Sequence, residues 1–316
     1  MVAPLRVVFF GTPAFAVPTL EALLASRHPV VGVVTQPDRP RGRGRRVSDA
    51  PVKAVAVAAG LPVVQPDRLR DPAVLDTLRE WRPDLGVVAA YGKLIPDAVL
   101  NLPRHGMINV HASLLPKYRG AAPIHRAVID GEAETGVTIM RVETMLDAGP
   151  MLAKARRLIG PNDTSDVIEP DLARLGASLL VEVVEQIAAG TVRQELQNST
   201  LSSHAPKLTK EEGLIDWTLP AASIHNRVRG LYPWPHAFTY LNGTRIIVLE
   251  TRVDDAPSDA PAGTIVDVAR DAIHVATGHQ GRLAIARVQL EGGRPLTVRE
   301  FLAGHPVRTA AIFSNA

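Results

Sequence analysis

Short apolar runs alternate with amphipathic stretches along the first 190 residues. The runs are nearly continuous in hydrophobic residues, which is typical of strands covered on both faces of a parallel sheet. They lie at residues 5–10, 30–35, 61–66, 84–90, 106–112 and, with more polar alternation, 135–142. Apolar spacing of three and four predicts helices around residues 20–24, 51–60, 71–81 and 172–190, with Pro170 just before the last helix's first turn. Strands alternating with helices predict an α/β domain, doubly wound around a mostly parallel sheet.

The pattern changes after residue 190. Residues 191–206 are polar and lack a clear period, and we predict an interdomain linker there. Short β-rich runs follow at residues 246–253, 263–269, 272–278 and 283–290, separated by Gly, Pro and Asp. This spacing predicts a small β-barrel or sandwich. We therefore divide the chain into a domain at residues 1–190, a linker at 191–206 and a second domain at 207–316.

Composition narrows the class of protein. The chain of 316 residues is 46% hydrophobic, which is ordinary for a soluble globular protein, and no stretch approaches a membrane span. It contains no cysteine, which excludes disulfides and cysteine nucleophiles and favours a reducing cytoplasm. We expect a cytoplasmic protein, and a monomer because nothing demands a dimer. The net charge of +3 decides little, but residues 38–46 read DRPRGRGRR, with five arginines and one aspartate.

Asn109 and His111 form an unusual polar pair near the end of one predicted strand, in the stretch INVHASLLPKYRGAAP that begins at Ile108. Because side chains alternate along a strand, Ile108 and Val110 share one face and the polar pair shares the other. Each polar group in a core needs a partner. In an open parallel sheet, ligands bind beyond the carboxyl ends of the strands, where this pair lies.

Four loops follow predicted strands and are candidate ligand loops; they begin at Gly11, Thr35, Ala90 and His111. None carries a nucleotide signature, because GTPAFA lacks two glycines of the dinucleotide fingerprint and the chain has no G-x-x-x-x-G-K-[ST]. No H-x-x-x-H or H-E-x-x-H pattern lies near His111, and asparagine is a poor metal ligand. We expect no NAD, no ATP and no metal.

Taken singly, these residues have plainer explanations. A lone histidine at a strand end is more often a satisfied core or surface residue, and Asn109 could form a turn. Asp147, in MLDAGP, could start the turn before Gly149. The arginine-rich stretch could be a solvated loop.

Together, the motifs are far more specific. Over its whole length the chain resembles the 10-formyltetrahydrofolate-dependent formyltransferases, and among them the enzymes that act on aminoacyl-tRNA. The matching segments include VVFFGTPAFAVPTLEALL, VVTQPDRPRGRGRR, AYGKLIP, INVHASLLPKYRGAAPIHRAVIDGEAETGVTIM, LDAGPML, APKLTKEEGLIDW and NRVRGLYPWPHAF. The resemblance implies a Rossmann-like formyltransferase domain followed by a C-terminal barrel related to the OB-fold, which agrees with the division drawn above.

The resemblance also implies a reaction: a formyl group passes from 10-formyltetrahydrofolate to the α-amine of methionine on initiator tRNA, for translation initiation. It places catalysis on Asn109, His111 and Asp147, without a metal or nucleotide cofactor. Histidine suits a base that works near physiological pH. An asparagine amide and a protonated imidazole can both donate to a tetrahedral oxyanion. Asp147 can orient His111, stabilise its charged form or hold a relay water, and the sequence leaves these alternatives open.

Binding residues follow from the same resemblance. The folate pocket is expected at Ser113, Leu114, Leu115, Pro116, Tyr91, Gly92, Leu94 and Ile95. Contacts to tRNA are expected at Arg39, Arg41, Arg43, Arg45, Arg46, Lys207 and Lys210. Arginines there can contact phosphates and stack on terminal bases.

Other readings compete with this one. Phosphoribosylglycinamide formyltransferases share the three catalytic residue types but typically have a single domain. Sugar-nucleotide formyltransferases have a second domain but lack the arginine-rich loop, and a formyltetrahydrofolate hydrolase needs no basic surface. A non-enzymatic RNA-binding or folate-sensing protein would make Asn109, His111 and Asp147 dispensable.

Overall fold

The computed structural model describes residues 2–38, 40–41, 46–47 and 49–314, with the backbone alone at 40–41 and 46–47. It divides into two compact units. Unit 1 comprises Met1–Pro123, Glu134–Leu158 and Glu169–Ala205, and unit 2 comprises Ile124–Ala133, Ile159–Ile168 and Pro206–Ala316. This division differs from the expected one, because residues 124–133 and 159–168 pack with the C-terminal part and residues 191–205 pack with the N-terminal part.

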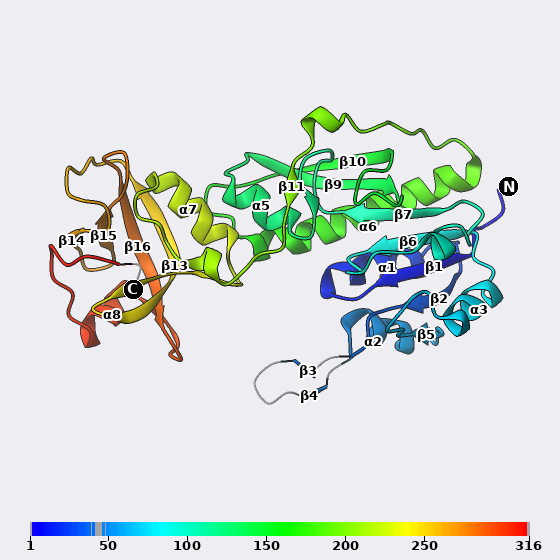
Figure 1. Ribbon diagram of the computed structural model, residues 1–316, viewed down its shortest axis with the longest axis horizontal. Helices are drawn as coiled ribbons and strands as arrows, with labels where there is room; N and C mark the ends of the chain where they lie inside the picture. Colours follow the sequence, from blue (N-terminus) through cyan, green and yellow to red (C-terminus); the bar gives the residue numbers. More distant parts are fainter. Residues whose placement is uncertain (1, 39, 42–45, 48, 315–316) are drawn as a thin grey trace. The chain divides into compact units, whose positions relative to one another are not determined.

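Unit 1 is built on a seven-stranded, mostly parallel sheet, as the apolar runs predict (Figure 1). Its order is β10 (Met151–Leu158), β9 (Glu134–Arg141), β7 (Met107–His111), β6 (Leu85–Ala89), β1 (Val7–Gly11), β2 (Val30–Val34) and β5 (Val63–Val64). Only β9 breaks the parallel pattern, since it runs antiparallel to both β7 and β10. From β1 the chain moves outward through β2 to β5 and then returns to the other side of β1 with β6. This reversal is the topological switch point at which ligands bind in such sheets.

Helices surround this sheet and begin where the sequence gives start signals. They are α1 (Val17–Leu24), α2 (Pro51–Ala58), α3 (Pro72–Glu80), α4 (Asp97–Leu100) and α6 (Ser165–Ala189). The first three have proline in the first turn, where the missing N–H costs nothing. The Asp71 side chain also caps α3 by accepting a hydrogen bond from the Ala73 amide at 3.0 Å.

Pro170 lies inside α6 rather than before it, so the expected helix start was wrong. The helix begins at Ser165, and Pro170 is its sixth residue. Proline cannot donate the hydrogen bond to the carbonyl four residues earlier, here that of Asp166. The cost falls close to the helix start, and the buried Ile168 and Leu172 on either side continue the apolar stripe through it.

The two faces of β7 have different surroundings. On one face, Val110 and Val137 lie against Gly176 of α6, where a Cβ atom would come within 2.7 Å of the Val110 side chain. On the other face, Met107 belongs to a buried cluster with Phe10, Leu78 and other residues from β1, α3 and α4. Because side chains alternate, Asn109 and His111 share this second face with Met107. The strand register pairs Asn109 with Val88 of β6 and His111 with Thr138 of β9.

Unit 1 also contains two short strand pairs, one antiparallel and one parallel. Strand β3 (Pro40–Arg41) pairs antiparallel with β4 (Arg46–Val47) in the arginine-rich loop. Strand β8 (Arg119–Gly120) pairs in parallel with β11 (His204–Ala205). The second pair ties the segment that was expected to be a linker to the loop that follows His111. A short 3-10 helix, Ser199–Leu201, lies within that segment.

Unit 2 contains an antiparallel sheet, as the short β-rich runs predict. Its order is β12 (Ala237–Leu241), β13 (Thr244–Asp254), β16 (Arg282–Leu290), β15 (Ile273–Ala276) and β14 (Ile265–Val268), and β17 (Pro295–Thr297) also pairs with β16. Helices α5 (Pro123–Ile129), α7 (Ala221–Gly230) and α8 (Val298–Gly304) complete it.

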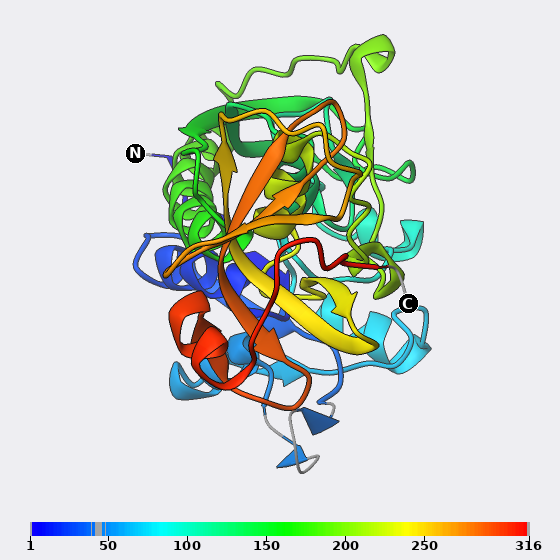
Figure 2. The same cartoon turned by 90° about the vertical axis from the view of Figure 1, so that its left-hand side faces the viewer.

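The last described residues close this sheet into a barrel. Residues 310–314 hydrogen-bond to β14 through Ile265 and to β12 through Tyr240, so the two edge strands share one bridging segment. Figure 2 shows this segment in dark red, crossing from α8 to the C-terminus. Within the described residues, no helix is both long and apolar enough to cross a membrane.

Candidate active site

The structure brings together the three residues expected to carry catalysis. Asn109 and His111 lie on β7, and Asp147 lies on the loop between β9 and β10. The Nδ1 atom of His111 is 3.7 Å from Oδ2 of Asp147, and the two side chains are 6% and 12% exposed. When the imidazole is protonated, shielding from water makes its attraction to the carboxylate stronger than that of an exposed pair at the same distance.

The other nitrogen of His111 is already committed. Its Nε2 atom lies 2.9 Å from the carbonyl oxygen of Tyr118. A carbonyl can only accept, so this contact assigns a proton to Nε2. The nitrogen that can gain or lose a proton in the site is therefore Nδ1, which faces Asp147.

Asp147 is held by the backbone. Its Oδ2 atom accepts a hydrogen bond from the Gly120 amide at 2.9 Å, which fixes the carboxylate to β8. Asp147 also has a φ of 49°, a left-handed conformation that residues other than glycine seldom adopt. Gly120, with a φ of 125°, approaches the neighbouring strand so closely that a Cβ atom would lie 2.7 Å from the Ala205 carbonyl oxygen. The two residues joined by this hydrogen bond thus both have unusual backbone conformations.

Asn109 differs from His111 and Asp147 in how its side chain is bonded. Its side chain is partly exposed, and none of the hydrogen bonds among the described residues involves it. An amide at the end of a strand, free to donate, is the group that an oxyanion needs.

A cavity of about 740 Å³ opens on the same face of β7. Its walls come from α4, the start of β7 and the loop after β9; they are Asp97, Leu100, Asn101, His105, Gly106, Met107, Arg141, Val142, Glu143, Thr144, Met145, Pro150 and Gln194. Met107 lies two residues before Asn109, about 7 Å along the strand. The cavity therefore lies on the face of β7 that carries Asn109, toward the start of the strand, and none of Asn109, His111 and Asp147 is among its lining residues.

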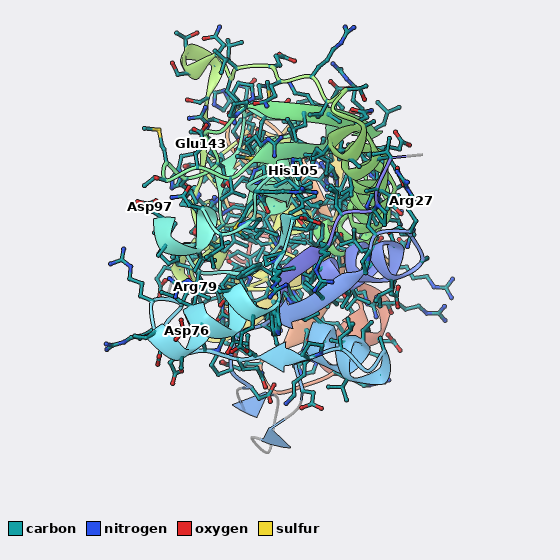
Figure 3. The ribbon with its side chains drawn as sticks, turned by 90° about the vertical axis from the view of Figure 1, so that its right-hand side faces the viewer. Arg27, Asp76, Arg79, Asp97, His105 and Glu143 are labelled. Carbon is teal, nitrogen blue, oxygen red and sulfur yellow. The ribbon has the colours of Figure 1, made fainter. Side chains whose placement is uncertain are left out.

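Two ionisable residues of the cavity, Arg141 and His105, are partly buried, whereas Asp97 and Glu143 are exposed. Arg141 donates from Nη1 to the His105 carbonyl at 2.6 Å, and burial lowers the pKa of Arg141 and of His105. Figure 3 shows Asp97, His105 and Glu143 on the side of unit 1 where this cavity lies. These lining residues could not be identified from the sequence, because the apolar and charged residues of a cavity wall follow no motif.

The residues expected to bind folate occupy two kinds of position. The side chains of Ser113, Leu115 and Tyr91 are buried, at 0%, 1% and 1% exposure. Leu115 packs with Met140 and Met151, and Tyr91 packs edge-on to Phe10 at 5.6 Å. These residues can reach a ligand only through their backbone.

The remaining expected folate residues are more accessible. Leu94 is 75% exposed and Gly92 is exposed. Leu114, Pro116 and Ile95 are partly buried. Leu94 and Ile95 lie on the loop after β6, and Leu114 and Pro116 lie on the loop after β7. Because their side chains are accessible, they remain candidate walls of a folate site.

The residues expected to bind tRNA are only partly covered by the structure. Arg39, Arg43 and Arg45 lie outside the described residues. The backbones of Arg41 and Arg46 lie opposite each other in the β3–β4 strand pair. Lys207 and Lys210 are exposed, at the start of the long C-terminal stretch of unit 2.

The base of the arginine-rich loop is clamped. Asp38 accepts hydrogen bonds from Lys53, from Gln65 at 3.0 Å and from the Ala50 amide at 3.2 Å, so it joins the two ends of the loop. The hydrogen bond from Lys53, followed by that from Gln65, lowers the pKa of Asp38. Across residues 2–38, 40–41, 46–47 and 49–314, no group of three His, Cys, Asp or Glu residues gathers as metal ligands would.

Comparisons with known proteins agree on one family. A formyl transferase family model matches residues 5–184, and a model of the formyl transferase C-terminal domain matches residues 207–306. The chain is 44% identical over 311 residues to a methionyl-tRNA formyltransferase from Alkaliphilus metalliredigens, covering 98% of this chain and 99% of that one. It is 47% identical over 301 residues to the enzyme of the same name from Methylococcus capsulatus, covering 95% and 97%.

Solved structures share the fold. An N-formyltransferase from Helicobacter canadensis, in complex with folinic acid and dTDP-3-aminofucose, has a TM-score of 0.69 at 16% identity, covering 89% of this chain and 98% of that one. A glycinamide ribonucleotide transformylase from Symbiobacterium toebii has a TM-score of 0.52 at 21% identity, covering 62% and 95%.

Proposed function

The chain belongs to the formyl transferase family, and from this premise we propose that it is a methionyl-tRNA formyltransferase. It transfers the formyl group of 10-formyltetrahydrofolate to the α-amino group of methionine on initiator tRNA. The observation that carries the chemistry is the pairing of a free Asn109 amide with His111 Nδ1, beside Asp147 and a cavity on the same strand face.

The reaction replaces one carbon–nitrogen bond by another. The neutral α-amine attacks the formyl carbon, and the amide bond to methionine forms as the bond to N10 of the folate breaks. The amine loses a proton and N10 gains one, so a group that can accept and return a proton serves both steps. His111 Nδ1 takes this role. Asp147 stabilises the imidazolium when it forms.

The tetrahedral intermediate carries a negative oxygen. The Asn109 amide and the protonated His111 ring donate to it, and neither has to break an existing bond at the atoms concerned. No covalent enzyme intermediate is needed.

We propose that the folate co-substrate binds in the cavity. We place its flat heterocycle between the loop after β9 and α4, so that N10 points toward Asn109. A partly apolar cavity with a few polar groups suits such a ring. None of the eight expected folate residues lines the cavity itself, and we propose that they border the bound folate outside it: Leu94, Ile95, Leu114 and Pro116 with accessible side chains, and Ser113, Leu115, Tyr91 and Gly92 with backbone.

The acceptor RNA is assigned to the arginine-rich loop and to the C-terminal part, residues 207–316. Arg39, Arg41, Arg43, Arg45 and Arg46 contact phosphates and terminal bases of the acceptor stem, and Lys207 and Lys210 contact phosphates. All three catalytic residues come from one chain, so the site needs no second copy, and we propose that the enzyme acts as a monomer in the cytoplasm, where charged tRNA is found.

The test is a formyl-transfer assay with 10-formyltetrahydrofolate and three acceptors: methionyl initiator tRNA, free methionine and uncharged initiator tRNA. Transfer to the charged tRNA alone is expected. Consumption of the folate without transfer to tRNA would point instead to a hydrolase or to a small-molecule acceptor.

A further inference from the structure

The segment 191–205 is bound to unit 1 at both of its ends. Near its start, Glu195 and Met151 exchange backbone hydrogen bonds of 2.8 and 2.9 Å. Near its end, β11 pairs with β8, and the Ser203 hydroxyl accepts from the Tyr118 amide at 2.9 Å. A segment that only joined two domains would need none of these bonds.

Between these anchors, the side chain of Gln197 makes four hydrogen bonds. Its Oε1 atom accepts from Nε and Nη2 of Arg119 at 3.0 and 2.7 Å. Its Nε2 atom donates to the carbonyls of Asp147 and Gly149, both at 2.8 Å. A primary amide has two donor hydrogens and an oxygen that accepts twice, so every group is used. The side chain is partly buried, which shields these bonds from water.

The two carbonyls that Gln197 holds flank the tightest part of the catalytic loop. Asp147 has a φ of 49°, which persists only where the surroundings hold it. At Gly149 a Cβ atom would lie 2.2 Å from the Arg141 carbonyl oxygen, so the loop has no room to shift toward β9. Gln197 therefore holds this loop from segment 191–205, a separate part of the chain.

Arg119 links this contact to the other side of the site. It lies next to Gly120, whose amide holds the Asp147 carboxylate, and directly after Tyr118, whose carbonyl holds His111 Nε2. Gln197 therefore connects, through its own hydrogen bonds, the loop that carries Asp147 with the strand that orients both Asp147 and His111.

We infer that Gln197 is a positioning residue for formyl transfer, which sets the distance between Asp147 and His111 through the Asp147 and Gly149 carbonyls. The inference rests on the proposed function. Gln197 does not touch the reacting atoms. Its removal should leave both substrates bound but let the Asp147 carboxylate drift, and misplacement of about 1 Å in an active site can cost up to about a hundredfold in rate.

Two substitutions separate the parts of this role in the full-length protein. Gln197→Ala removes all four hydrogen bonds. Gln197→Glu keeps oxygen acceptors for Arg119 but cannot donate to the two carbonyls. Asn198→Ala is the matched control, because among the described residues that side chain accepts hydrogen bonds from Thr200 alone, within the same segment.

Steady-state formylation of methionyl initiator tRNA is measured for each protein. Both Gln197 variants are expected to lower kcat about tenfold or more, with KM for the folate and for the tRNA within about twofold of the wild type. Asn198→Ala should match the wild type. If Gln197→Glu keeps full kcat, or if KM rises while kcat holds, the positioning role is overturned.

A double-mutant cycle with Asp147→Asn tests whether the effect passes through Asp147. Once the carboxylate is gone, Gln197→Ala should cost little more, so the two losses should not add. Additive losses would mean that Gln197 stabilises the protein or acts elsewhere. A wild-type enzyme that does not formylate the tRNA would overturn the proposed function and this inference with it, whereas an active wild type with active Gln197 variants would overturn the inference alone.

Discussion

The side chains of Asn109 and His111 differ in how many of their hydrogen-bonding groups are already used. His111 Nε2 is bound to the Tyr118 carbonyl, whereas the Asn109 amide makes no side-chain hydrogen bond among the described residues. At the scale of single residues, His111 is thus already oriented by a hydrogen bond to the protein, whereas the Asn109 amide is available to a ligand. The open groups are the ones that the proposed transition state would occupy.

Asn109→Ala and His111→Ala should each lower kcat by about two orders of magnitude or more. Asn109→Ala removes an oxyanion donor, and His111→Ala removes the group that moves the proton. Single-turnover formylation measures the chemical step directly. Folate binding, followed by fluorescence or calorimetry, should stay close to that of the wild type, and near-normal turnover in either variant would exclude the assigned role.

Tyr91 shows how a residue can lie in the expected folate motif and still face away from a ligand. Its hydroxyl is buried without a hydrogen-bond partner in the described part of the chain, and burial raises the pKa of Tyr91 to about 12. Its carbonyl, in contrast, accepts from Gln36 Nε2 at 2.7 Å. The ring fills the core while the backbone borders the ligand loops.

Tyr91→Phe should therefore leave folate affinity unchanged and raise the unfolding free energy by about 1 kcal/mol, since a buried unsatisfied hydroxyl carries a desolvation penalty. Denaturant unfolding and a folate titration on the same protein measure both quantities. A loss of folate affinity would show that the hydroxyl, rather than the backbone, contacts the ligand.

At the scale of elements, the arginine-rich loop depends on its base as well as on its arginines. Asp38 joins the chain before the loop to Ala50 and Lys53 after it. The β3–β4 pair lies beyond this clamp. A loop whose ends are fixed loses less conformational freedom when it binds RNA.

Asp38→Ala should raise the KM for methionyl-tRNA roughly fivefold, which corresponds to about 1 kcal/mol, while folate affinity is kept. Asp49→Ala is the matched control, because the exposed Asp49 also pairs with Lys53 but does not bridge the loop. Arg43→Ala should raise the same KM. An unchanged KM in Asp38→Ala would show that the clamp does not prepare the loop for RNA.

The regular elements could be predicted from the sequence to different extents. The parallel strands and the helices at α2 and α3 follow from apolar periodicity and from Pro and Gly at their ends. Strand β10 was missed because its burial alternates and three of its eight residues are charged. The segment 191–205 was interpreted as a linker because its bonds are made by backbone and by Gln197, and such bonds leave no periodic pattern.

The residues of the candidate site could likewise be predicted only in part from the sequence. The strand-end pair Asn109 and His111 could be found from sequence, since polar residues on a buried strand are unusual. The left-handed Asp147 and the carbonyl contact of Tyr118 could not, because both depend on how three separate loops meet. Cavity walls such as Met107 and Leu100 look like ordinary core residues until the fold places them.

At the scale of the whole molecule, the two units are not simple successive halves of the chain. Unit 2 recruits residues 124–133 and 159–168, and its contacts include the His125 ring with the Gly230 carbonyl at 2.8 Å and Ser165 with the same carbonyl at 2.9 Å. A fragment that ends near residue 190 or 205 would expose these segments. Activity lost in such a fragment would therefore report misfolding as well as lost RNA contacts.

His225 gives unit 2 a dependence on pH. Its Nδ1 contacts the Thr251 hydroxyl and its Nε2 contacts the Pro161 carbonyl, both at 2.9 Å. Burial is the main cause that lowers the pKa of His225 below its ordinary value of 6.5. Below about pH 6.5 the unfolded chain then binds a proton that the folded chain does not, so the unfolding free energy falls as the pH is lowered.

His225→Gln should be less stable than the wild type at about pH 8 but lose less stability between about pH 8 and pH 5.5. Thermal unfolding of unit 2, followed by calorimetry at several pH values, measures this difference. An identical pH dependence in both proteins would show that other groups govern the acid sensitivity.

The segment 310–314 has a consequence for how the protein avoids self-association. By bonding to β12 and β14 at once, it occupies backbone groups that two edge strands would otherwise present to solvent. Unpaired edges are templates on which a second molecule can add a strand. Removing these five residues would therefore expose two edge strands at once, and a second molecule could pair with either of them. A tag added at the C-terminus would have to leave residues 310–314 bound to both strands.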